Sequence, residues 1–421
     1  MSSAHAARPK VVVVGGGFAG LSAARELSGG DVDVLLLDRD PYNTFQPLLY
    51  QVATGTLNPG DVTYALRAFA GRHPHVRFQR ARVDRVDPDR KRVHVEGGGE
   101  VAYDYLVVAC GVTANYFGIP GAAEHARTIY RRGGAIGVRD RLLSNLEAFA
   151  QDHEDAAEPV VVVVGGGPTG VEMAGALAEL RNTALPIAYP EVDPRRARVV
   201  LVEMADEVLG PFAPSLRAYA AHALRKRGVE LKLGVAVEEV RSDCVLLSDG
   251  ERLPAAATIW ATGVKVDDDV SGWGLPQGRG GRIEVGPDLR VEGHPEVFAV
   301  GDVAAGRDGA LPQLARPAID GGRHAAAQVR RLLAGLPTEP FTYRDRGTAA
   351  TIGRSDAVIE LPFGVRVRGL PAWLGWVAIH VIMLMGGRNR VATVVNLAAR
   401  YLTWRRSANV IVGDPPPLVR G

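Results

Sequence analysis

The chain has 421 residues, of which 49 are basic and 47 acidic, so its formal net charge at pH 7 is only +2. This balance, and the lack of a basic patch mixed with aromatic residues in the first 350 positions, excludes a general electrostatic attraction to nucleic acid. At roughly 100 to 200 residues per domain, the length predicts about three modules with ample hydrophobic core.

Thiols and metal ligands are sparse. The only cysteines, Cys110 and Cys244, are far apart in the sequence, and the ten histidines are scattered. No Cys or His spacing is typical of a metal centre, so we predict no metal site. The N-terminal residues lack the charged and then apolar pattern of a secretory signal, and we therefore expect a reduced, cytoplasmic setting.

One pattern occurs twice: a β-branched run, a glycine-rich loop and a segment with the apolar spacing of a helix. The run Val11–Val14 precedes the loop at 15–20, and Val160–Val164 precedes the loop at 165–170. Such loops place the pyrophosphate of a dinucleotide at a helix N-terminus, so two bound dinucleotides are predicted. The loop residues expected to bind them are Gly15, Gly17, Phe18, Ala19 and Gly20 in the first copy and Gly165, Gly167, Pro168, Thr169 and Gly170 in the second.

An acidic residue ends the strand after each copy, where it can accept a hydrogen bond from a ribose hydroxyl. Asp38 lies eighteen residues after Gly20, which is close to the usual spacing. Glu203 lies thirty-three residues after Gly170, because an insertion separates the helix from the strand. A carboxylate at Glu203 would repel a 2′-phosphate, and we therefore predict NADH rather than NADPH at the second loop.

Three later strand ends are typical of a flavin protein. Two of them finish on a glycine, and the third finishes on Gly301 and Asp302. The carboxylate of Asp302 is expected to accept from ribityl hydroxyls, and a helix from about 314 to 333 should direct its N-terminus at the flavin. FAD is therefore predicted at the first loop, without the close cysteine pair that exchange with a disulfide requires. The residues expected to bind a cofactor at these strand ends are Ala109, Gly111, Thr262, Gly263, Gly301 and Asp302.

These features together resemble the type II NADH:quinone oxidoreductases, a family of two-dinucleotide flavoprotein reductases. The resemblance is carried by residues 45–55 (FQPLLYQVATG), 103–121, the second loop with Glu172, 311–326 (LPQLARPAIDGGRHAA) and the C-terminal tail. It implies an enzyme that passes hydride from NADH to FAD and then two electrons to a membrane quinone. It also implies that no protons are pumped.

The resemblance further implies roles for several polar residues. Gln46, Tyr50 and Gln51 are expected to border the flavin and line the quinone mouth. Glu172 is expected to orient the nicotinamide or relay a proton, and the alternative is a plain acid in the first turn of a helix. In many members a glutamine faces the quinone where this chain has Asp320. An acid there can hydrogen-bond or protonate a quinone oxygen, and Arg316 can hold it ionised.

The expected fold is α/β, with two Rossmann-like domains of mostly parallel sheet, one inserted in the other. The insertion follows because Asp302 must return to the first loop. We predict an FAD domain at 1–120 and 281–345, and an NADH domain at 121–280. A C-terminal membrane-associating helical region is predicted at 346–421.

The composition of the tail indicates a membrane surface. From 361 to 421 there are eight arginines against one acid, Asp414, together with Trp373, Trp376 and Trp404. The apolar run at 370–385 is shorter than the roughly 20 residues that span a bilayer. We therefore expect a helix that lies in the interface, at the cytoplasmic face of the cell membrane. A core helix or a dimer helix is the alternative.

Two other function classes stay open, partly because Asp320 replaces the glutamine. The first is a soluble NADH-dependent flavin reductase that delivers electrons to an acceptor other than a quinone. The second is an NADH-binding redox sensor in which a long-lived charge-transfer complex changes dimerisation. A homodimer is compatible with each of these functions.

Overall fold

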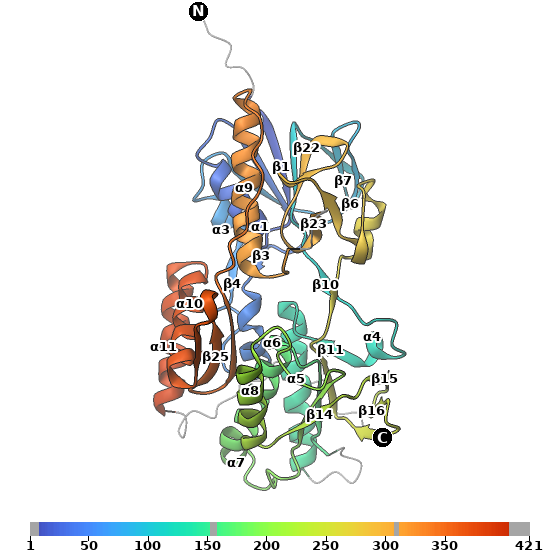
Figure 1. Ribbon diagram of the computed structural model, residues 1–421, viewed down its shortest axis with the longest axis vertical. Coiled ribbons are helices and arrows are strands. Elements are labelled where there is room, and N and C mark those ends of the chain that lie inside the picture. The colour runs from blue at the N-terminus through green and yellow to red at the C-terminus, as the bar shows by residue number, and fades with distance from the viewer. Residues whose placement is uncertain (1–7, 152–157, 307–310, 404–421) are drawn as a thin grey trace, which may run out of the picture. The chain divides into compact units, whose positions relative to one another are not determined.

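The computed structural model describes residues 8–151, 158–306 and 311–403 (Figure 1). By its internal contacts the chain divides into two compact units. The first unit comprises Met1–Asn43, Tyr64–Thr113 and Val264–Arg344, and the second comprises Thr44–Thr63, Ala114–Gly263 and Asp345–Gly421. Short strands lie where the chain passes from one unit to the other: β3 (Tyr42–Thr44), β4 (Thr63–Ala65), β10 (Thr113–Ala114) and β19 (Val264–Lys265).

An eight-stranded sheet forms the centre of the first unit, in the order β23-β20-β21-β22-β9-β1-β2-β5. Its strands are β1 (Lys10–Val14), β2 (Asp33–Asp38), β5 (Val76–Arg80), β9 (Tyr105–Val108), β20 (Ile283–Val285), β21 (Arg290–Val291), β22 (His294–Ala299) and β23 (Ala304–Gly306). The middle strands are parallel: Val12 stands opposite Leu35 on one side and Leu106 on the other. Val12 is fully buried, because both faces of such a sheet are covered.

Helices α1 (Phe18–Leu27) and α9 (Ala315–Leu333) pack against each other in the first unit (Figure 1). Gly322 of α9 allows the close approach, since a Cβ there would lie 2.1 Å from the carbonyl oxygen of Ala19. Only glycine fits a backbone contact this tight. The predicted helix from about 314 to 333 is confirmed.

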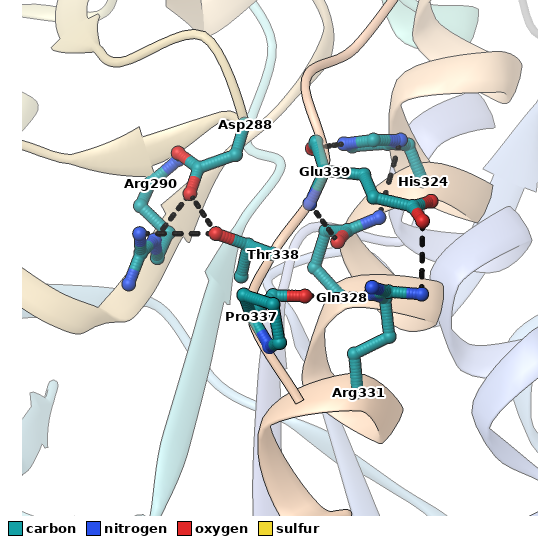
Figure 2. Close-up of polar contacts among 8 residues, drawn as sticks. All are labelled: Asp288, Arg290, His324, Gln328, Arg331, Pro337, Thr338 and Glu339. Atoms are coloured by element: carbon teal, nitrogen blue, oxygen red, sulfur yellow. Dashed lines mark hydrogen bonds and ion pairs between the residues drawn. The ribbon is translucent and has the colours of Figure 1, made fainter. Parts of the chain in front are cut away.

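The segment that follows α9 is tied to the same unit on two sides (Figure 2). Thr338 donates to Asp288 at 2.6 Å and accepts from Arg290 at 3.1 Å. The backbone N–H of Glu339 donates to Oε1 of Gln328, on α9, at 2.8 Å. These polar contacts fasten the C-terminal half of α9 to the β21 edge, and they fix the helix whose N-terminus is expected at the flavin.

A five-stranded sheet forms the centre of the second unit, in the order β11-β18-β12-β13-β14. Its strands are β11 (Ala126–Thr128), β12 (Val161–Val164), β13 (Val199–Glu203), β14 (Val229–Leu233) and β18 (Ala257–Trp260). All neighbouring pairs are parallel, and Val163 stands opposite Leu201 on one side and Ile259 on the other. The larger helices of this part are α5 (Arg132–Ala150), α6 (Pro168–Glu179) and α8 (Pro214–Lys226). The predicted α/β class with two Rossmann-like sheets is confirmed.

The C-terminal region of the second unit adds an antiparallel sheet and two helices. These elements are β24 (Thr348–Gly353), β25 (Asp356–Glu360), β26 (Arg366–Arg368), α10 (Leu370–Met383) and α11 (Gly387–Thr403). Strand β24 lies against α6, where a Cβ at Gly175 would be 2.5 Å from the carbonyl oxygen of Ile352. Helix α11 is tied to the start of β4, since Asn389 donates to the Thr63 carbonyl at 2.6 Å.

The contacts group the sequence differently from the predicted domain limits in several places. Residues 44–63 and 114–120 of the predicted FAD domain belong to the unit of the NADH sheet, and so does 345–421. Residues 264–280 of the predicted NADH domain belong to the first unit. The reason is the packing of β24 on α6 and of α11 on the 58–63 segment, which chain order does not reveal. Trp404 and Asp414 lie outside the described residues.

The smaller elements complete both units. In the first unit they are α3 (Leu66–Ala70), β6 (Val83–Asp87), β7 (Arg92–Val95) and β8 (Gly99–Ala102), with 3₁₀ turns η3 (Asp268–Trp273), η4 (Arg279–Gly281) and η5 (Gly301–Val303). In the second unit they are η1 (Gln46–Leu48), α2 (Leu49–Ala53), α4 (Ala122–His125), the π-helix η2 (Leu180–Ala184), α7 (Leu185–Ala188), β15 (Val237–Val240), β16 (Cys244–Leu247), β17 (Arg252–Pro254) and η6 (Pro362–Gly364). The insertion before β13 thus forms short helical turns.

The side chains of helix α10 differ widely in their exposure to solvent. Trp376 is 1% exposed and Ala372 is fully buried, whereas Leu374 and Ile382 are 56% and 69% exposed. Trp376 therefore packs inside the second unit, although it belongs to a segment whose composition indicates a membrane surface. Among the described residues, no helix combines the length and the apolar character needed to cross a membrane.

Candidate functional site

The two glycine-rich loops make equivalent backbone contacts in their separate units. In each, the N–H of the first glycine, Gly15 or Gly165, donates to the neighbouring strand at 2.8 Å. Their φ angles of 108° and 111° belong to the region that favours glycine. At Gly17 and Gly167 a Cβ would meet no atom within 4 Å. Each loop therefore has open space where a pyrophosphate is expected.

In each unit, the acid at the end of the following strand accepts a hydrogen bond from the glycine-rich loop. Asp38 accepts from the N–H of Gly16 at 2.5 Å, and Glu203 accepts from the N–H of Gly166 at 2.5 Å. Burial raises the pKa of Asp38, and the backbone hydrogen bonds to its carboxylate oppose that rise. Both acids lie beside their loops, in the place that contact with a ribose requires.

Asp302 lies in the 3₁₀ turn after β22, close to the helix pair of the first unit. The φ of Gly301 is 73°, and a Cβ there would lie 3.2 Å from that of Ala19 and 3.3 Å from that of Ala318. Burial raises the pKa of Asp302 to about 6, opposed by the charge of Arg282. The turn thus places a partly buried carboxyl group near the start of α9.

A pocket opens at the carboxyl ends of β1 and β2 in the first unit. Its lining residues are Val14, Gly15, Leu37, Asp38, Arg39, Ala81, Arg82, Val83, Cys110, Asp267, Asp269, Val270 and Trp273. Two ion pairs border it, between Arg39 and Asp267 at 3.3 Å and between Arg82 and Asp269. Ligands of α/β sheets bind at this edge, so the pocket fits the adenosine end of FAD. Burial raises the pKa of the Cys110 thiol to about 12, which suppresses thiolate chemistry.

Phe117 lies beside the strand end that carries Thr262 and Gly263 in the second unit. Gly263 has a φ of 61°, and a Cβ there would lie 2.2 Å from the ring of Phe117. The ring is 60% exposed and its residue has a φ of 54°. Phe117 belongs to no motif of its own in the sequence, and its only signal was its position within the 103–121 segment. Its ring lies against one side of the strand end near the second loop.

Tyr50 and Gln51 of α2 are buried and join a hydrogen-bonded chain. Gln51 donates through Nε2 to the Tyr50 hydroxyl at 2.9 Å, and that hydroxyl lies 3.0 Å from Oγ1 of Thr351 on β24. Among the described residues, Oε1 of Gln51 is buried without a hydrogen-bond partner. Gln46 lies apart, since it is exposed and its amide donates to the carbonyl of Tyr130 at 3.4 Å.

Glu172 of α6 also contacts β24. Its carboxylate accepts from the backbone N–H of Thr351 at 3.3 Å. Burial raises the pKa of Glu172 to about 8, and the interactions with Thr351 and with the indole of Trp376 oppose that rise. The N–H of Trp376 is buried. We call Tyr50, Gln51, Glu172, Thr351 and Trp376 the buried cluster.

His380 stacks on Trp376 of this cluster. Its ring centroid lies 3.8 Å from that of Trp376, with 21° between the planes, and Nδ1 donates to the Trp376 carbonyl at 2.7 Å. Burial lowers the pKa of His380 to about 4, so the ring is neutral at physiological pH. A neutral, stacked imidazole fixes the orientation of the indole.

Family models match most of the chain. Residues 9–322 match the pyridine nucleotide-disulphide oxidoreductases, and residues 346–406 match the NDH2 C-terminal domain. The type II NADH:quinone oxidoreductase Ndh of Mycobacterium tuberculosis is 36% identical over 95% of this chain and 89% of its own length. The chain belongs to the type II NADH:quinone oxidoreductases.

Further relatives of this type II oxidoreductase agree with that assignment. The mitochondrial internal alternative NAD(P)H-ubiquinone oxidoreductase A1 of Arabidopsis thaliana is 31% identical over 94% of this chain and 85% of its own length. A solved structure of NDH2 from Plasmodium falciparum, in complex with NADH, covers 94% of this chain and 99% of its own with a TM-score of 0.88, at 18% identity. That structure shares the fold.

Membership of the family assigns the activity: the protein is an NADH:quinone oxidoreductase with FAD as its cofactor. The individual roles of the predicted site residues stay predictions. In this type II oxidoreductase, Tyr50, Gln51 and Glu172 come together around β24, whereas Arg316 and Asp320 form an ion pair at 2.9 Å on α9 in the first unit. Thr351 was not predicted from the sequence, and Trp376 entered the prediction only through the membrane-surface composition of the tail.

Proposed function

We propose that the buried cluster forms the acceptor side of this NADH:quinone oxidoreductase. The observation that carries the proposal is a buried polar atom without a hydrogen-bond partner in the described residues, Oε1 of Gln51. Buried polar groups left unpaired are costly, so a native structure retains them only for a reason. A quinol hydroxyl donates to an amide oxygen. The amide oxygen of Gln51 therefore suits the reduced acceptor.

Glu172 is proposed to hold the proton that the acceptor takes up. Reduction of a quinone to a quinol needs two electrons and two protons, whereas NADH supplies one hydride. With a pKa of about 8, Glu172 is mostly protonated at neutral pH and is matched to proton transfer there. The N–H groups of Thr351 and Trp376 stabilise the carboxylate that remains after the transfer. FAD, bound at the first loop, supplies the two-electron chemistry between nicotinamide and acceptor.

Arg316 and Asp320 are proposed to act on the quinone, as the family resemblance implies. Their side chains form an ion pair at 2.9 Å on α9, and Arg323 lies 4.0 Å from the same carboxyl group. Asp320 is proposed to hydrogen-bond to a quinone oxygen. Gln46, at the exposed start of η1, is proposed to border the mouth.

The C-terminal helices are proposed to rest on the cytoplasmic face of the cell membrane. The described apolar side chains that support this are exposed on α10 and α11: Leu370, Leu374, Ile379, Ile382, Val391, Val394 and Val395. Exposed arginines accompany them, including Arg388 and Arg390. Apolar side chains with basic groups suit the boundary between anionic headgroups and acyl chains. A homodimer remains compatible with this attachment.

The decisive experiment is anaerobic stopped-flow spectroscopy of the FAD-loaded protein. One equivalent of NADH is added, and a short-chain quinone is then mixed in while flavin absorbance is followed. We expect rapid reduction and rapid reoxidation in the wild type. In Glu172→Gln, reduction by NADH should persist while reoxidation slows by about 100-fold or more. A matched control is Glu179→Gln on the same helix, which should react as the wild type does.

Other outcomes would separate the competing functions. Wild-type flavin that reduces rapidly but stays reduced with every quinone would favour a soluble reductase with another acceptor or a redox sensor. Equal reoxidation rates in Glu172→Gln and the wild type would remove Glu172 from the proton path while leaving the activity in place.

A further inference from the structure

Phe363 is the most exposed apolar residue of the C-terminal region. It lies in η6, at the tip of the hairpin that joins β25 to β26, and its relative exposure is 103%. Its backbone has a φ of 65°. A bulky L residue such as phenylalanine rarely adopts this left-handed conformation, which strains its backbone. We call Leu361–Val365 the hairpin tip.

The hairpin itself does not require a phenylalanine at this position. Glycine or asparagine adopts a positive φ without the strain, and both are common in such turns. The ring is not packed against the protein, so it contributes no core contact that would offset the strain. Strain retained at an exposed position points to a role outside the folded chain.

The surroundings of Phe363 indicate what the ring meets. Leu361 and Val365 on either side are 39% and 51% exposed, so the hairpin tip is apolar throughout. Arg366 and Arg368 follow on β26 and are exposed. Arg366 forms an ion pair with Glu360 at 3.6 Å. The second arginine, Arg368, keeps the segment basic overall. An apolar projection backed by arginines matches the boundary between anionic headgroups and acyl chains.

The position of the tip in the chain supports the same partner. Strand β26 leads through Gly369 directly into α10, whose first residue, Leu370, is 51% exposed. Helix α10 also packs on β25 and β26. We propose that the hairpin tip inserts Phe363 into the lipid surface as a membrane contact separate from the helices. This inference rests on the proposed membrane attachment and adds a second anchor to it.

The test is vesicle binding by the purified holoenzyme. Flotation with mixed phosphatidylcholine and phosphatidylglycerol vesicles is compared for the wild type, Phe363→Asn and Phe363→Trp. Loss of one inserted aromatic ring should weaken partitioning of Phe363→Asn by about tenfold. Phe363→Trp should bind at least as tightly as the wild type, because tryptophan favours the interface. Leu336→Asn, which removes an apolar side chain 49% exposed in the first unit, is the matched control and should bind normally.

A stability measurement keeps the result interpretable. Because asparagine tolerates the left-handed backbone, Phe363→Asn should unfold at the same temperature as the wild type or above it. Weaker binding by a variant that is at least as stable supports the inference. Equal binding of Phe363→Asn and the wild type overturns it, and so does an equal loss in Leu336→Asn. A shift from dimer to monomer in Phe363→Asn, without lipid and with unchanged vesicle binding, also overturns it by assigning the tip to a protein contact.

The same data separate this inference from the attachment on which it depends. Wild-type protein that does not float with vesicles contradicts membrane attachment as a whole. Wild-type protein that floats, together with Phe363→Asn that floats equally well, contradicts only the role of the hairpin tip. The rate of NADH oxidation with a soluble quinone should be the same in all these variants, because Phe363 touches no part of the proposed acceptor site.

Discussion

The hydroxyl of Tyr50 lies 3.0 Å from Oγ1 of Thr351, although 301 positions separate the two residues. The contact joins α2, in the segment expected to line the quinone mouth, to β24, in the C-terminal region. Glu172 accepts from the backbone N–H of the same Thr351. One strand residue thus contacts the proposed quinone-binding tyrosine through its side chain and the proposed proton donor through its backbone.

Thr351→Val should impair the reaction with quinone and spare the reaction with NADH. Valine preserves the shape and suits a strand, so only the hydroxyl contact with Tyr50 is removed. At about 1 kcal/mol for such a hydrogen bond, kcat/KM for the quinone should fall about fivefold. Stopped-flow reduction of the flavin by NADH should keep its rate. Thr348→Val, on the same strand, is the control, and an equal fall in both variants would contradict a specific role for Thr351.

Glu172 should make the stability of the protein depend on pH. Its carboxyl loses its proton near 4.5 in the unfolded chain and near 8 in the folded protein. Between these values the folded state binds more protons, so the free energy of unfolding falls as pH rises through this window. The slope is at most about 1.4 kcal/mol per pH unit. Thermal unfolding of Glu172→Gln should therefore lose less stability than the wild type from about pH 5 to about pH 8. Parallel curves would show that the carboxyl is not held protonated.

Glu203→Gln should relax the preference for NADH. The carboxylate beside the second loop repels a 2′-phosphate, and an amide of the same size does not. In the wild type the N–H of Gly166 donates to the Glu203 carboxylate at 2.5 Å. The amide oxygen of the variant can still accept this hydrogen bond. We expect kcat/KM for NADPH to rise about tenfold, with a smaller fall for NADH, in steady-state assays with both cofactors. An unchanged ratio of the two constants would place the 2′-hydroxyl away from Glu203.

Two neighbouring glycines of α9 should respond oppositely to alanine. At Gly322 the new Cβ would lie 2.1 Å from the carbonyl oxygen of Ala19, so helices α1 and α9 must separate. Gly322→Ala should cost about 3 kcal/mol and release FAD, as measured by thermal unfolding and flavin fluorescence. At Gly321 the nearest atom would lie 3.6 Å away, which is an ordinary contact. Gly321→Ala should therefore be neutral or stabilising, by about 0.5 to 1 kcal/mol. Equal unfolding temperatures would refute the proposed clash.

Both cofactor loops were predictable because their signals are local. A buried strand, a glycine turn and a helix follow one another within about thirty residues, and the acids Asp38 and Glu203 end the next strand of each sheet. The structure places each acid against its loop with the same hydrogen bond at 2.5 Å. Helix α9 was predictable for a similar reason, since its apolar spacing and the preceding Gly301 and Asp302 lie in one stretch of chain.

The buried cluster depended on the tertiary structure. Its side chains come from α2, α6, β24 and α10, and periodicity indicates which face of an element is buried but not which element covers it. Trp376 lies in a segment whose composition is typical of a membrane surface. It nevertheless packs inside the second unit, because one side of α10 faces the protein. The sequence by itself determined the two dinucleotide loops, their acids and the family. Only long-range packing decided that Thr351 and Trp376 meet Glu172, because residues far apart in the chain are joined by side-chain fit and not by spacing.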